Sequence, residues 1–266
     1  MVIVRRSLLA LVLALVWALP VHAQAVFDNA QQATSGTGTS LSITIDCSGT
    51  NTVLYVGVAE DVSAAVTTPT VTHNSDAVGL LDELQETDTG QWTRYLGVFR
   101  RIAPASGSQT VSITGLDAAA NQKHAIAYCV TGADQTTPED ATVTSFGVAS
   151  TTGITTTTGS ITSGANDLVI DFVAIDGGST GPTLTVASGT IPTNGQSDNA
   201  MVLSSSWEDT GTVTKNWDWT GAQNFVHIVI NVNEAAGAAA APPKLMLLGV
   251  GGESCEEEEE WYDKAA

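Results

Sequence analysis

Most of this chain alternates between apolar and polar residues with a period of two. Leu41, Ile43 and Ile45 are separated by polar residues, and short runs rich in Val, Ile and Thr recur between residues 25 and 233. Gly, Asn, Pro or Ser residues interrupt these runs. A period of two places successive side chains on opposite faces of a strand, so these runs predict half-buried antiparallel strands. The pattern argues against a helical bundle and predicts an all-β fold.

The same series of strands is repeated along the chain. Residues 48–61 resemble residues 163–176, at an offset of 115 positions. Later matches keep this order while the offset falls to about 102, as changes in loop length would produce. Val111 and Ile113 match Trp217 and Trp219, and Ile126, Tyr128 and Val130 match Ile228, Ile230 and Val232. We therefore expect two similar halves of about five strands each, at about residues 25–140 and 141–234.

Five strands are few for an independent sandwich, since an immunoglobulin-like sandwich has about seven. The two halves together supply about ten strands, enough for one sandwich of two sheets. We expect an antiparallel, jelly-roll-like β-sandwich domain at residues 24–234. Two smaller sandwiches in tandem are the alternative.

The ends of the chain differ from this body. Residues 1–23 contain the basic Arg5 and Arg6, then an apolar stretch, and end at Ala23. This arrangement is typical of a cleaved signal peptide. Residues 235–266 combine an Ala-rich segment, two prolines and a run of Glu, which is typical of a linker and a disordered acidic tail. We expect an exported protein, secreted or at the cell surface, with no membrane span.

The charge of the chain excludes several classes of partner. It has 28 acidic residues against nine Lys and Arg, a formal net charge of -19. So few basic residues cannot form the patch that nucleic acids require. Anionic membrane surfaces would repel such a chain. Its content of hydrophobic residues, 43%, excludes an intrinsically disordered body.

Three segments resemble a known group of proteins. They are Phe27-Asp28-Asn29-Ala30, residues 49–58, and Thr131-Gly132-Ala133-Asp134-Gln135-Thr136-Thr137-Pro138 after Tyr128. These segments are similar to the F-D-x-A start and the G-x-D-Q-T-T-P segment of exported bacterial, and also phage-associated, concanavalin-like or jelly-roll β-sandwich modules. The resemblance covers residues 25–233 and implies a fold and an extracellular setting. Its motifs are structural turns, so it implies no catalytic residues.

Aromatic residues are the candidates for ligand binding. Trp217 and Trp219 are two positions apart and share one face of a strand, as a platform for sugar rings would require. Trp92 and Tyr95, in a polar stretch, are further candidates. The alternative is that the paired tryptophans fill the core, because the repeat aligns them with apolar residues.

Carboxylates suggest a metal site rather than catalysis. A glycosidase needs two carboxyl groups at a defined separation, and the E-x-D-x-x-E string of concanavalin-like hydrolases is absent from the sequence. We therefore assign no catalytic residues. Asp61 and Asp176, at the ends of equivalent strands, are candidate Ca²⁺ ligands. The alternative is that they cap turns.

Three cysteines remain in an exported chain. The alternation places Cys47 on the face of Leu41, Ile43 and Ile45, and places Cys129 off the face of Tyr128. We therefore expect Cys47 and Cys129 on opposed faces, which argues against a disulfide, although an exported protein would permit one.

These patterns favour a non-enzymatic exported β-sandwich with a surface, extracellular-matrix or assembly role. Its partners would be a polysaccharide, a cell-surface glycan or further copies of the chain, added strand to strand at sheet edges. One alternative is a glycoside hydrolase or lyase on a jelly-roll scaffold. Another is a structural or decoration protein of a virion.

Overall fold

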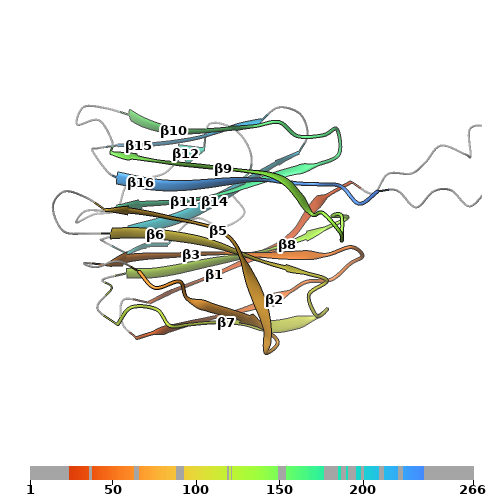
Figure 1. Ribbon diagram of the computed structural model, residues 1–266, viewed down its shortest axis with the longest axis horizontal. Coiled ribbons are helices and arrows are strands. Elements are labelled where there is room, and N and C mark those ends of the chain that lie inside the picture. Colours follow the sequence, from red (N-terminus) through yellow and green to blue (C-terminus); the bar gives the residue numbers. More distant parts are fainter. Residues whose placement is uncertain are drawn as a thin grey trace, which may run out of the picture. The chain divides into compact units, whose positions relative to one another are not determined.

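Every helix or strand element described in the computed structural model is a β-strand (Figure 1), so the expected all-β class is confirmed. Within the described residues, no helix has the length and apolar character needed to cross a membrane. The described strands belong to one compact unit, Val21–Gly237. The structure describes residues 24–35, 38–62, 66–87, 93–118, 120, 122–148, 154–176, 185–186, 190, 196–198, 201–209, 213–220 and 224–236.

The first half of the chain forms an eight-stranded antiparallel sheet in the order β1-β8-β3-β6-β5-β4-β7-β2. This sheet folds over at β5, because Val78 pairs with β4 whereas residues from Gly79 onward pair with β6. Its strands are β1 (Val26–Ser35), β2 (Ser40–Asp46), β3 (Val53–Val62), β4 (Thr70–His73), β5 (Asp76–Thr87), β6 (Thr93–Ile102), β7 (Ser108–Thr114) and β8 (Gln122–Thr131).

The second half forms two separate sheets. The five-stranded sheet has the order β13-β14-β11-β16-β9, and the three-stranded sheet has the order β10-β15-β12. The strands are β9 (Glu139–Val148), β10 (Ile154–Ile161), β11 (Leu168–Asp176), β12 (Thr185–Val186), β13 (Gln196–Asp198), β14 (Met201–Asp209), β15 (Val213–Thr220) and β16 (Asn224–Val232).

The central strands of the two halves have the same pairing and the same register. Val53 of β3 lies opposite Val130 of β8, and Leu168 of β11 lies opposite Val232 of β16, as the repeat in the sequence requires. The edge strands β1 and β9 are equivalent, and each contains an irregularity near its start. Each half therefore contributes eight described strands, more than the five or so expected from the sequence, since strands such as β1 show no regular alternation of buried and exposed residues.

Buried apolar side chains form clusters between the sheets. In the first half, residues of β2 and β7 pack against residues of β3 and β8, such as Val56. In the second half, a smaller apolar group includes Ile161 and Val229. A third group lies between the halves and includes Tyr55 and Phe172. The fold is a stack of packed antiparallel sheets, so β3 and β16 are buried on both faces along their whole length.

The halves contact each other through close packing and polar bonds. Gly57 of β3 lies against the ring of Phe172, and a Cβ atom at this glycine would lie 2.3 Å from Phe172 Cδ1. Tyr55 Oη donates a hydrogen bond of 2.6 Å to Glu139 Oε1 of β9. Arg100 forms an ion pair with the same carboxylate. These contacts make the two halves one packed body.

The segment that connects the halves is a structural turn. Asp134 Oδ1 accepts hydrogen bonds from the backbone N–H groups of Thr136 and Thr137, at 2.6 and 2.9 Å. The backbone N–H of Asp134 donates to Asn233 O at 2.9 Å, and that of Gly132 donates to Thr50 O at 3.1 Å. The side chain of Asp134 therefore orders a turn that is bonded to both halves.

Cys47 and Cys129 form a disulfide, with their Cα atoms 5.4 Å apart. The expectation that they occupy opposed faces was wrong. Tyr128 faces the second half, whereas Cys129 and Ala127 face the core of the first half together with Cys47. The alternation around Tyr128 predicted one buried face for β8, but both of its faces are covered.

Candidate functional site

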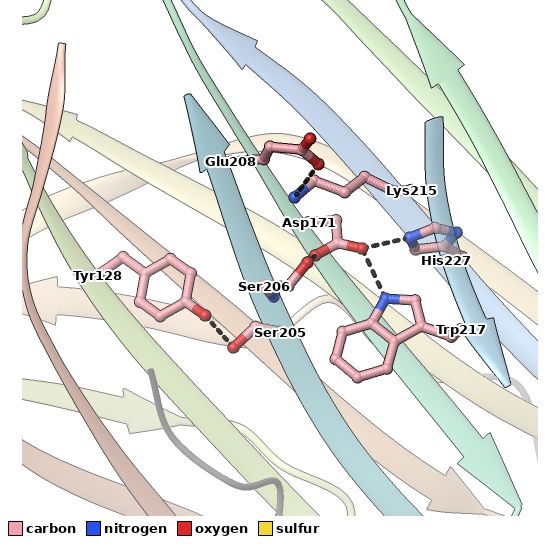
Figure 2. A network of polar contacts seen from close by, with 8 residues as sticks. All are labelled: Tyr128, Asp171, Ser205, Ser206, Glu208, Lys215, Trp217 and His227. Carbon is pink, nitrogen blue, oxygen red and sulfur yellow. Dashed lines mark hydrogen bonds and ion pairs between the residues drawn. The ribbon is translucent and has the colours of Figure 1, made fainter. Parts of the chain in front are cut away.

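A buried carboxylate lies in the second half (Figure 2). Asp171 is fully buried, yet its two oxygens accept four hydrogen bonds. Oδ1 accepts from the backbone N–H and the hydroxyl of Ser206, at 2.7 and 2.6 Å. Oδ2 accepts from Trp217 Nε1 at 2.6 Å and from His227 Nε2 at 2.8 Å. We refer to Asp171, Ser206, Trp217 and His227 as the Asp171 network.

Strand geometry explains why these residues meet. Along β11, Ile170 and Phe172 face the first half, so Asp171 faces the three-stranded sheet. Ser206 of β14 lies directly opposite Asp171, and His227 of β16 lies opposite the nearby Val173. Trp217 comes from β15 of the three-stranded sheet. The network therefore ties together the two sheets of the second half.

The surroundings of Asp171 favour its ionised form. Burial on its own would raise the pKa of the carboxyl group. The hydrogen bond from His227, the charges of His227 and Lys215, and the bond from Ser206 together outweigh burial and hold the pKa of Asp171 below its ordinary value. Lys215 is itself fully buried, with its Nζ 3.7 Å from Glu208 Oε2 (Figure 2). The site is thus a buried carboxylate surrounded by donors and cations.

The first half has apolar residues at each equivalent position. The shared register aligns Asp171 with Val56 and Ser206 with Phe99. By the same alignment, Trp217 corresponds to Val111 and His227 to Ala125. All four of these apolar residues belong to the core of the first half.

The network contains a Ser, a His and an Asp, but it is not arranged as a hydrolytic triad. In a triad the serine hydroxyl donates to the imidazole, and the carboxylate orients the imidazole. Here the hydroxyl of Ser206 donates to Asp171, so its proton points to the carboxylate. Asp171, Ser206 and His227 are all fully buried, which leaves a substrate no access in this structure. The arrangement stabilises the packing of two sheets.

The structure locates two of the four predicted aromatic ligands. The side chains of Trp217 and Tyr95 are both fully buried, so neither ring is exposed for sugar stacking. Tyr95 Oη donates to Glu83 Oε2 at 3.2 Å. For Trp217, this agrees with the alternative that it fills the core. Trp92 and the side chain of Trp219 lie outside the described residues.

The structure describes the side chain of one of the two predicted calcium ligands. Asp61 is buried near the end of β3, opposite Arg94 of β6. Asp176 ends β11, and its side chain lies outside the described residues. Among the described residues, no three His, Cys, Asp or Glu side chains form a group that could hold a metal ion. Calcium binding by Asp61 and Asp176 stays a prediction.

The sequence held one signal for the Asp171 network that our predictions did not use. Asp171 is a charged residue within the apolar run Leu168-Val169-Ile170-Asp171-Phe172-Val173. An acid in a strand buried on both faces must find donors, so its position predicts a buried polar network. The comparisons with known proteins add no further signal. No protein-family model, curated protein or solved structure matches this chain.

Proposed function

We propose that this chain is an exported structural protein with a surface, extracellular-matrix or assembly role, and that its copies associate by strand addition at the edge strand β9. The observation that carries the proposal is the composition of this edge. β9 ends the five-stranded sheet, and it has no charged residue from Ala141 to Val148. Uncharged edge strands rich in β-branched residues are templates for pairing with another chain.

Natural proteins protect their sheet edges with charges, prolines or bulges. The irregularity in the pairing of β9 lies at its start, beside Glu139, and the remainder of the strand pairs regularly with β16. The equivalent edge strand β1 has the same arrangement, with an irregularity next to Asp28 and no charge from Asn29 to Ser35. Within the described strands, both edges therefore contain an uncharged segment of similar length.

Charge favours a second copy of this chain that approaches along these edges. A net charge of -19 makes most surfaces of two copies repel each other. The uncharged segments of β1 and β9 are surfaces on which two copies can meet without bringing acidic side chains together. Association should therefore strengthen as salt screens the repulsion between the two bodies.

Sedimentation velocity and electron microscopy on the purified exported chain, over a range of protein and salt concentrations, test this proposal. We expect oligomers or fibres that increase with salt. Thr142→Lys should suppress them, because Thr142 is exposed on β9 and a lysine there charges the edge. Thr110→Lys is the matched control, since Thr110 is equally exposed but lies on β7, between β2 and β4. A chain that stays monomeric throughout, or equal effects of the two variants, would contradict the proposal.

A further inference from the structure

A second polar cluster lies at the end of β16, and its hydrogen bonding is incomplete. Asn231 is fully buried. Its Nδ2 lies 2.8 Å from Asp140 Oδ1, 3.0 Å from Asp167 Oδ2 and 3.1 Å from Asn233 Oδ1. An amide nitrogen has two hydrogens, so it cannot serve three acceptors fully. Its own Oδ1 is buried and has no hydrogen-bond partner among the described residues.

Other bonds hold the surrounding oxygens in place. Asp167 Oδ2 accepts from Gly164 N at 2.6 Å, and Asp167 Oδ1 accepts from Glu234 N at 3.0 Å. The amide of Asn233 is oriented by its own bond from Nδ2 to Thr137 O, at 2.9 Å. Asp167 and Asn233 therefore direct oxygens towards the amide of Asn231 for reasons independent of that residue.

We infer that Asp140, Asp167, Asn231 and Asn233 form a calcium-binding site, in which the amide of Asn231 turns by half a rotation and its Oδ1 becomes a ligand. The rotation exchanges the two amide atoms, so it brings the unpartnered oxygen to within 2.8–3.1 Å of three other oxygens. Without a cation these four oxygens would repel one another. In a calcium site with six to eight oxygens at about 2.3–2.6 Å, neighbouring ligands are crowded to similar separations.

The donor set matches the chemistry of Ca²⁺. Two carboxylates balance its charge, and two amide oxygens add neutral hard ligands. Mg²⁺ requires a more regular octahedron and shorter distances, which a crowded cluster of this kind suits less well. The site is distinct from the pair Asp61 and Asp176, which the sequence suggested.

The repeat offers an independent argument. Asn231 is equivalent to Cys129, which forms the disulfide of the first half, and Asp140 is equivalent to Asp28. The first half thus has a covalent cross-link at the strand position where the second half has the oxygen cluster. A calcium ion at this cluster would connect β9, β16 and the start of β11. It would therefore cross-link strands of the second half as the disulfide cross-links strands of the first half.

Isothermal titration of the full chain with CaCl₂, after removal of metal with EDTA, tests the inference. We expect one Ca²⁺ per chain, and at 100-fold excess over Kd a rise in Tm of about 5–10 °C. Asp140→Asn should weaken binding by at least about tenfold, since even outer partners of metal ligands contribute that much. Asp140 is exposed, so this variant should fold.

Asp28→Asn is the matched control, because Asp28 is exposed and lies at the equivalent position of β1. It should leave the calcium affinity unchanged. Wild-type protein that neither binds Ca²⁺ nor gains Tm would overturn the inference. Equal effects of Asp140→Asn and Asp28→Asn would also overturn it.

The variant Asn231→Asp separates a ligand from a hydrogen-bond donor. If the oxygen of Asn231 binds calcium, Asp at this position brings a third carboxylate to the site. The variant should then have a lower Tm than wild type in EDTA, and calcium should raise its Tm by more than it raises that of wild type. If Asn231 is only a donor, the variant will stay destabilised at every calcium concentration, and the inference fails.

Discussion

The two halves of this protein have the same strands in the same register, but they stabilise their interiors by opposite means. The first half packs Val56, Phe99, Val111 and Ala125 into an apolar core, which a disulfide closes. The second half has Asp171 and its three donor residues at these positions. One fold therefore tolerates either solution, provided that each buried polar group finds partners.

The comparison also shows why the polar interior is the more fragile of the two. An apolar core loses stability gradually, as methyl groups are removed. A buried ionic network is cooperative, because the loss of one partner leaves the other partners desolvated and unpaired.

Asp171→Val, which copies Val56 of the first half, should give the largest loss. The donors of Ser206, Trp217 and His227 would lose their acceptor inside the core. We expect the free energy of unfolding to fall by about 3–5 kcal/mol, as for other broken buried ion pairs. Urea unfolding followed by fluorescence measures this change.

A second variant replaces all four residues of the Asp171 network with their equivalents from the first half. Asp171→Val combined with Ser206→Phe, Trp217→Val and His227→Ala rebuilds the apolar set of the first half and removes the three side-chain donors together with their acceptor. We expect this variant to recover most of the stability that Asp171→Val loses, because replacement of a whole buried ionic group by apolar residues is often neutral or favourable. A fourfold variant less stable than Asp171→Val would contradict this expectation. It would show that the network stabilises the second half beyond the pairing of its own polar groups.

Removal of the disulfide should destabilise the first half selectively. The bond spans 82 residues of sequence, so Cys47→Ala with Cys129→Val should lower the free energy of unfolding by about 2–4 kcal/mol. Hydrogen exchange should rise in β2, β7 and β8 more than in β11 and β16. Cys255→Ser, which changes the third cysteine in the tail expected at residues 235–266, is the control and should leave the free energy of unfolding unchanged. Uniform loss of protection across both halves would mean that the halves do not differ in this way.

The sequence patterns predicted correctly which residues are buried in a strand with one covered face. They failed for strands that are covered on both faces. The alternation of β2 is confirmed, with Leu41, Ile43 and Ile45 buried between exposed neighbours. The repeat also predicted which strands are equivalent. The prediction was wrong about the face of β8 on which Cys129 lies, and it did not identify the role of Asp171. Both residues lie in strands that are covered by a layer on each side. Neighbouring residues of such a strand, for example Tyr128 and Cys129, belong to two different apolar cores. A period-two pattern does not show which core each residue enters.

A side chain at Gly57 should disturb the contact between the halves rather than either core. The Cβ of Gly57→Ala would lie 2.3 Å from the ring of Phe172, so this ring or the backbone must move. We expect a loss of about 1–3 kcal/mol, as for other overpacked interiors. Gly79→Ala is the control, since the nearest atom to its Cβ would be 3.8 Å away. Thermal melts of both variants measure the difference, and equal Tm values would contradict a tight interface at Gly57.

The smallest effect that we predict is on the acid sensitivity of the second half. The pKa of Asp171 lies below its ordinary value because the charges and hydrogen bonds around it outweigh its burial. In the unfolded chain an Asp takes up a proton near pH 3.9, whereas folded Asp171 does so only at lower pH. The stability that it contributes is therefore complete above about pH 4, and is lost as pH falls through the lower, folded pKa.

Asp171→Asn removes this titration, whereas Val56, at the equivalent position of the first half, cannot titrate at all. The variant should be less stable than wild type at neutral pH, but its free energy of unfolding should fall less steeply below about pH 4. Urea unfolding at a series of pH values measures both slopes. The remaining carboxyl groups, including Asp134 with its lowered pKa, contribute equally to the two curves. Parallel curves would therefore show that Asp171 has no part in the acid sensitivity, and that the halves respond to acid alike despite their different interiors.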